Sequence, residues 1–144
     1  MMNHDSIRLL QECNSGCKNA TNSMEQVKEY IKDPKFEELI DDYNRKHIAI
    51  GEECQRLLEQ CGEDGKDPSA AARAVSWIGT EVKLALNDTT SKIAGIMMDG
   101  CNMGLKSVSG YRNQYSAASP QSVRLADNLI STEQNFMRDL MPFM

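Results

Sequence analysis

The sequence has no long apolar run, few aromatic residues and no excess of positive charge. No stretch approaches the roughly 18 continuous apolar residues that a transmembrane helix needs. Sixteen Lys and Arg face 21 Asp and Glu, giving a formal net charge of −5. This balance argues against nucleic acid or an anionic membrane as a partner. Because only 6% of residues are aromatic and the aliphatic residues are spaced rather than clustered, we expect a single all-α domain over residues 1–144.

The signatures of secretion and of zinc or disulfide frameworks are also missing. The first residues carry neither the cationic start nor the apolar run of a secretory signal, so we expect a cytoplasmic protein. The cysteines are odd in number and form no Cys-x-x-Cys motif, and we therefore expect reduced thiols at Cys13, Cys17, Cys54, Cys61 and Cys101.

Apolar residues recur every three or four positions, which indicates amphipathic helices. We predict helices over residues 6–32 and 34–61, joined at Asp33-Pro34 as an antiparallel hairpin. Asp5 is the predicted N-cap of the first helix and Asp33 that of the second, and Gly62 ends the hairpin. The predicted inward stripe of the second helix consists of Phe36, Leu39, Tyr43, His47, Ile50, Cys54, Leu57 and Cys61.

The second half of the chain repeats this layout. We predict a short helix over residues 69–86, a helix over residues 89–115 and a last helix that begins at Ser119-Pro120 and ends at Pro142. The last helix should turn Val123, Ala126, Leu129, Ile130, Glu133, Met137 and Leu140 inward. The 26 residues 62–87 can span a whole bundle, which predicts a ferritin-like four-helix bundle of two hairpins with a long crossover containing a short fifth helix.

Ferritin-like di-iron sites need Glu-x-x-His motifs, and this sequence has none. The nearest approach is Asn44-x-x-His47, with an amide in place of the bridging carboxylate, and in the last helix Glu133 is followed by Phe136. We therefore expect no catalytic residues, no cofactor and no enzyme activity. The alternative is a metal ion held by Asn44, His47 and Glu133.

Two polar residues interrupt the apolar stripes. For His47 the simpler interpretation is a core-edge residue hydrogen-bonded to Asn22, Thr21 or a backbone carbonyl from a neighbouring helix, and the functional one is a single metal ligand or a pH-sensitive contact. Glu133 is expected opposite Gly104, on a hydrated boundary of the bundle. If Glu133 is buried instead, His47 is its expected partner.

Three cysteines are predicted to gather in the first hairpin. Cys13 and Cys17 share one helical face, and Cys54 is level with Cys13 across the joint. We expect the three thiols to pack as small apolar groups. The alternative is a soft-metal or redox site.

The chain ends in an apolar tail formed by Met137, Leu140, Met141, Phe143 and Met144. Because such a tail is poorly suited to water, we expect it to cap the end of the bundle or to form a homodimer or partner interface.

Several landmarks resemble a known family. They are the Asp33-Pro34 joint, Trp77 and Lys83-Leu84-Ala85-Leu86 in the crossover, Asp99-Gly100 and Ser119-Pro120. In this layout the chain resembles, over nearly its full length, a ferritin-like bacterial family catalogued as domain of unknown function 2383. The resemblance implies a four-helix bundle, a relation to stress proteins and no established enzymatic activity. Two hypotheses remain, a non-catalytic structural or stress-associated bundle and a metal- or thiol-dependent one.

Overall fold

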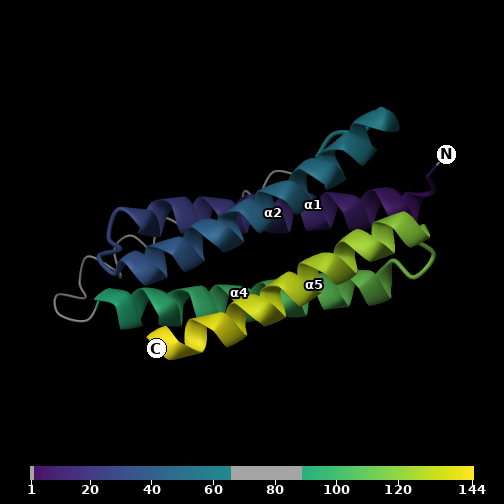
Figure 1. The fold of residues 1–144 in the computed structure, drawn as a ribbon. Helices are drawn as coiled ribbons and strands as arrows, with labels where there is room; N and C mark the ends of the chain where they lie inside the picture. Colours follow the sequence, from purple (N-terminus) through teal and green to yellow (C-terminus); the bar gives the residue numbers. More distant parts are fainter. Residues whose placement is uncertain (1, 66–88) are drawn as a thin grey trace.

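The chain folds as an all-α four-helix bundle in a computed structural model that describes residues 2–65 and 89–144 (Figure 1). Its helices are α1 (His4–Lys28), α2 (Pro34–Gln60), α4 (Thr89–Gln114) and α5 (Pro120–Leu140), followed by a short 3₁₀ helix, η1 (Met141–Phe143). The described residues contain no β-strand. The predicted all-α bundle is confirmed, whereas the predicted helix over residues 69–86 lies outside the described residues.

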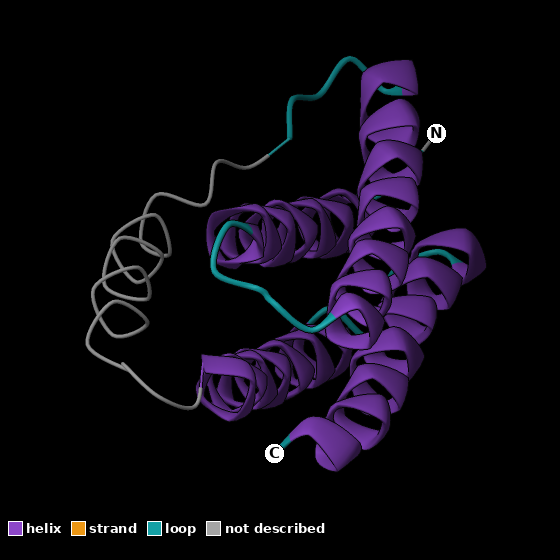
Figure 2. Ribbon diagram, turned by 60° about the vertical axis from the view of Figure 1, so that its left-hand side comes forward, coloured by secondary structure: helices purple, strands orange, loops and turns teal. Residues whose placement is uncertain are grey.

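The four helices form two antiparallel hairpins, α1 with α2 and α4 with α5 (Figures 1 and 2). α2 ends beside the first half of α1, where the Gln11 side-chain amide donates to the Asp64 carbonyl at 3.0 Å. α4 begins at the opposite end of the bundle, where Ile93 packs in one cluster with Val27 and Phe36. The end of α2 and the start of α4 are therefore a bundle length apart, as the predicted long crossover requires. None of the described helices is both long and apolar enough to cross a membrane.

The first helix differs from the prediction at both ends. Its N-cap is Asn3, whose Oδ1 accepts the Ser6 N–H at 2.9 Å, so the predicted cap at Asp5 is wrong. Asp5 instead accepts the backbone N–H of Ala117 at 3.0 Å. α1 ends at Lys28 rather than at residue 32, because the chain then tightens into a turn in which the Tyr30 N–H donates to the Val27 carbonyl.

The first turn of α1 is fastened to the loop between α4 and α5. The Asn3 side-chain amide donates to the Ala117 carbonyl at 2.8 Å, and the Ser119 N–H donates to Ser6 Oγ at 2.7 Å. Together with the Asp5 contact to Ala117, these bonds form an N-terminal clasp, consisting of Asn3, Asp5, Ser6, Ala117 and Ser119. The clasp pairs backbone groups of a loop that has no secondary structure of its own.

The other helix boundaries follow the sequence. Asp33 accepts the Lys35 N–H at 2.9 Å and Ser119 accepts the Ser122 N–H at 3.3 Å, so both predicted caps are confirmed. Gly62 has a φ of +73°, and the following N–H donates back to the Leu58 carbonyl at 2.9 Å. Such a left-handed residue closes a helix and favours glycine. Cys61, predicted to face inward, is exposed because it is the C-cap at the end of α2, which projects from the bundle (Figures 1 and 2).

The core consists of two apolar clusters along the bundle. The first core cluster contains Leu9, Leu10, Cys13, Cys17, Ile50, Cys54, Leu57, Leu58, Val108, Tyr115, Ala126 and Leu129. The second core cluster contains Met24, Val27, Phe36, Ile40, Tyr43, Ile93, Ala94, Met97, Cys101, Phe136 and Leu140. Phe136 on α5 is buried and stacks on Tyr43 with ring centroids 4.3 Å apart, whereas the neighbouring Met137, predicted to face inward, is only half-buried.

Candidate functional site

A polar layer lies between the two core clusters, at the middle of the bundle. It is formed by His47 on α2 and Glu133 on α5, with Gly104 on α4 facing them. The His47 and Glu133 side chains are only 1% and 7% exposed, and Nε2 of the imidazole contacts Oε1 of the carboxyl group directly. The expectation that Glu133 lies on a hydrated boundary is therefore wrong, and the alternative, burial against His47, is correct.

Gly104 explains how the acid fits inside the bundle. A Cβ built on Gly104 would lie 3.2 Å from Glu133 Oε2, closer than an ordinary van der Waals contact. A side chain at this position of α4 would therefore compete with the carboxyl group for space. The prediction that Glu133 lies opposite Gly104 is correct. The size of the space beside Gly104 depends on the separation of α4 and α5, which the sequence does not give.

The hydrogen bonds of His47 define where the protons are. Nδ1 lies 2.6 Å from the Tyr43 carbonyl oxygen, and because a carbonyl only accepts, Nδ1 carries a hydrogen. Nε2 faces Glu133, so one proton lies in this contact, either as imidazolium with carboxylate or as imidazole with carboxylic acid. In both forms the pair has no net charge. The partners expected for His47, Asn22 and Thr21, make neither of these bonds.

Two buried thiols from the remaining helices lie near the pair. Burial raises the pKa of Cys101 on α4, and the charge and hydrogen bond of Glu133 raise it further. Burial likewise raises the pKa of Cys17 on α1, with added contributions from Cys54 and from Glu133. Both groups therefore remain neutral thiols at neutral pH and are poor nucleophiles. Cys101 was not among the predicted site residues, although it precedes Gly104 by three residues and so shares its helical face.

Of the three candidate metal ligands, His47 and Glu133 are in direct contact. Both ring nitrogens of His47 are already engaged, and Asn44 has a buried Oδ1 that accepts no hydrogen bond from the described residues. Within residues 2–65 and 89–144 no group of three or more His, Cys, Asp or Glu has an arrangement suited to a metal ion.

The cysteines of the first hairpin lie together in the first core cluster. Cys13, Cys17 and Cys54 are all buried, and the Cys54 thiol contributes most to the raised pKa of Cys13. Cys17 instead faces Gly51, where an added Cβ would lie 3.1 Å from the Cys17 Cβ. The predicted register across the hairpin, with Cys54 level with Cys13, agrees with this arrangement.

Comparison with known proteins shows the fold alone. No family model matches the chain, and no curated protein does. A solved structure titled "Crystal structure of DUF305 fragment from Deinococcus radiodurans" superposes with a TM-score of 0.76 at 13% identity, covering 98% of this chain and 95% of that one. YcfI, described as a putative structural protein from Rhodopseudomonas palustris, superposes with a TM-score of 0.74 at 10% identity, covering 93% and 90%. These likenesses support a helical bundle, and membership of the family resembled in sequence is not confirmed.

Proposed function

We propose that this chain is a non-catalytic helical bundle that works by binding a second copy of itself or another protein. The observation that carries the proposal is the closed polar layer: its histidine and glutamate satisfy one another and have almost no exposed surface. A catalytic pair must reach a substrate, whereas a buried, mutually bonded pair serves the structure. The description of YcfI as a putative structural protein and the resemblance to domain of unknown function 2383 support a structural, stress-associated role.

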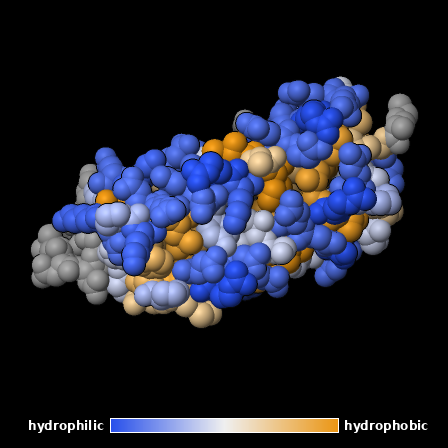
Figure 3. All heavy atoms as spheres, in the orientation of Figure 1, coloured by the Kyte–Doolittle hydropathy of each residue, from blue (hydrophilic) through white to orange (hydrophobic). Residues whose placement is uncertain are grey.

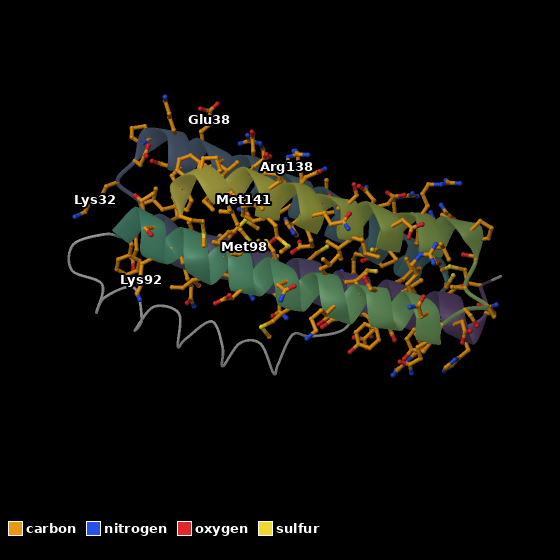
Figure 4. All side chains as sticks on the ribbon, turned by 90° about the horizontal axis from the view of Figure 1, so that it is seen from below. Lys32, Glu38, Lys92, Met98, Arg138 and Met141 are labelled. Atoms are coloured by element: carbon orange, nitrogen blue, oxygen red, sulfur yellow. The ribbon has the colours of Figure 1, made fainter. Side chains whose placement is uncertain are left out.

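The surface we assign to association is the end of the bundle that carries the apolar tail. η1 packs Phe143 against Phe36, with ring centroids 5.0 Å apart, but leaves Met141 and Met144 62% and 57% exposed. Polar residues cover much of the face in Figure 3, and of the four large apolar side chains that are exposed in the described part of the chain, two belong to this tail. Figure 4 shows Met98 and Met141 at this end with charged residues of both signs around them: Lys32, Glu38, Lys92 and Arg138. A rim of mixed charge suits a two-fold contact between identical copies.

Light scattering coupled to size-exclusion chromatography tests the dimer. We expect a concentration-dependent dimer for the unaltered protein and a monomer for the double variant Met141→Ser/Met144→Ser, because the apolar contact is lost. Met103→Ser is the matched control, since Met103 is 66% exposed on α4 but lies outside the tail, and it should dimerise normally. A monomer at every concentration of the unaltered protein would contradict self-association.

Metal analysis of protein purified without an affinity tag tests the non-catalytic part of the proposal. We expect no stoichiometric metal. A bound metal that is present in the unaltered protein and lost in His47→Ala would overturn the proposal in favour of a metal-dependent bundle.

A further inference from the structure

The α1–α2 hairpin brings two buried thiols together from residues far apart in sequence. Cys13 on α1 and Cys54 on α2 are both fully buried in the first core cluster, and the Cys54 side chain is the main cause of the raised pKa of Cys13. Nothing in the polar layer uses this pair: His47 bonds to Glu133, and the thiol beside Glu133 is Cys101. The pair is therefore a chemical feature of its own.

The local helix separation suits a covalent bond between these thiols. One turn away, a Cβ added to Gly51 would lie 3.1 Å from the Cys17 Cβ, so the two backbones approach closely at this point. Disulfides need Cβ atoms about 3.5–4.5 Å apart. Residue 13 lies four positions before residue 17 and residue 54 lies three positions after residue 51, so the two cysteines are about one helical turn further along the same antiparallel pair, on the faces that the helices present to each other.

We propose that Cys13 and Cys54 form a redox site, which a low-molecular-weight disulfide or hydrogen peroxide oxidises to a disulfide that locks α1 to α2. The two S–H bonds break and one S–S bond forms, releasing two protons and two electrons. A small disulfide takes them up to become two thiols, and hydrogen peroxide takes them up to become two water molecules. Small dithiols reverse the reaction by exchange.

Access to the pair is through the end of α2. Cys54 is within two turns of the last residue of α2, Gln60, and this end of the helix projects from the bundle (Figure 1). In the closed bundle Cys13 stays protonated, because the interaction with Cys54 and burial raise its pKa. One of the two cysteines can therefore attack the oxidant as a thiolate only after these turns open locally. Because this opening then limits the reaction, the oxidation rate should level off at high oxidant concentration.

The remaining cysteines are poorer partners. Cys17 faces Gly51 rather than a thiol, and Cys101 lies in the second core cluster beside Glu133. Cys61 is exposed, so it forms adducts and intermolecular disulfides without a partner in the core. Replacing it gives a clean background for the test.

The experiment exposes the full-length Cys61→Ser protein to oxidised glutathione or, separately, to hydrogen peroxide under native conditions. The protein is then unfolded in an alkylating reagent and analysed by intact mass and peptide mapping. We expect two fewer alkylated cysteines, a cross-linked peptide joining Cys13 to Cys54, and a urea midpoint that rises on oxidation and returns after reduction. Cys17→Ala in this background should still form the cross-link, and Cys54→Ala should not.

The mapped cross-link decides the matter without relying on the folding of any core variant. Full alkylation of Cys13 and Cys54 after native oxidation, a cross-link that maps to Cys17, or one that appears only when oxidant is added in urea would each overturn the proposal. Failure here leaves the bundle's proposed non-catalytic role intact, because that role depends on the polar layer and the tail.

Discussion

At the scale of single residues, the distinctive group is Glu133, an acid that the structure places in the core against His47. His47 accounts for its burial, because the pair shares one proton and carries no net charge. A buried ion or acid that loses its partner costs far more than the intact pair contributes. The chemistry of the layer therefore depends on both members being present.

We predict that Glu133→Ala destabilises the protein by about 3–5 kcal/mol, because His47 is left buried with Nε2 unpaired. Urea unfolding followed by circular dichroism measures the change. Glu53→Ala is the control, since Glu53 pairs with Arg56 on the surface and its loss should leave the midpoint nearly unchanged. A loss for Glu133→Ala as small as that of the control would show that the pair is not buried in solution.

Cys101 is expected to make the folded protein less stable at alkaline pH. Its pKa is raised in the folded state by burial and by Glu133, which faces it from α5 with His47 behind, so unfolding releases its proton once the pH exceeds the unfolded value. The thiol's contribution to the free energy of unfolding is fully present below the unfolded pKa. Above it, the free energy of unfolding falls by about 1.4 kcal/mol per pH unit for each such thiol.

We predict that Cys101→Ala lowers the alkaline slope of the free energy of unfolding against pH by the amount that corresponds to one proton released on unfolding. The slope near neutral pH should not change. Urea unfolding in reducing buffer across pH 8 to about 10 measures it, since an unperturbed thiol titrates near 8.5. Equal alkaline slopes for the variant and the unaltered protein would contradict the raised pKa.

At the scale of elements, α4 is distinguished by glycines that have different roles. Gly104 faces Glu133 in the core, whereas Gly110 is exposed and no described atom lies within 4 Å of an added Cβ. Glycine in a helix interior costs about 1 kcal/mol relative to alanine. At Gly110 nothing in the described structure offsets that cost. At Gly104 the Glu133 carboxyl group occupies the space that a side chain would fill.

We predict opposite signs for two otherwise identical substitutions. Gly110→Ala should stabilise the protein by roughly 0.5–1 kcal/mol through helix propensity. Gly104→Ala should destabilise it, because Glu133 is held by His47 and has little freedom to move away from the added methyl group. Thermal unfolding of both variants measures the difference. Stabilisation by Gly104→Ala would show that Glu133 can move away from the added methyl group and would contradict the prediction.

At the scale of the whole molecule, the helices and their pairing were predictable because the sequence signals are local. Caps at Asp33 and Ser119, the left-handed Gly62 and the spacing of apolar residues each act within a few positions. The rotation of α5 was not predictable, since turning Glu133 inward also brings Phe136 into the core, and this depends on Tyr43 and His47 of another helix. The grouping of Cys13 with Cys54 in the first core cluster likewise depends on the helix separation.

The polar layer also bears on how the two hairpins recognise one another. Replacing both members with leucine removes the unpaired-charge penalty and should be far less destabilising than Glu133→Ala. We predict that His47→Leu/Glu133→Leu unfolds near the unaltered midpoint but packs less uniquely, because apolar layers tolerate shifts along the bundle. Broadened amide resonances would show this, and a spectrum as sharp as that of the unaltered protein would contradict it.

The N-terminal clasp has a consequence for the order of folding. Asn3 and Asp5 bind Ala117, 114 and 112 positions later in the chain. The first turn of α1 therefore cannot complete its contacts until the residues up to Ser119 are present, and closure over so large a loop is slow. The α1–α2 hairpin can form early, but its outer edge stays open until the last hairpin arrives.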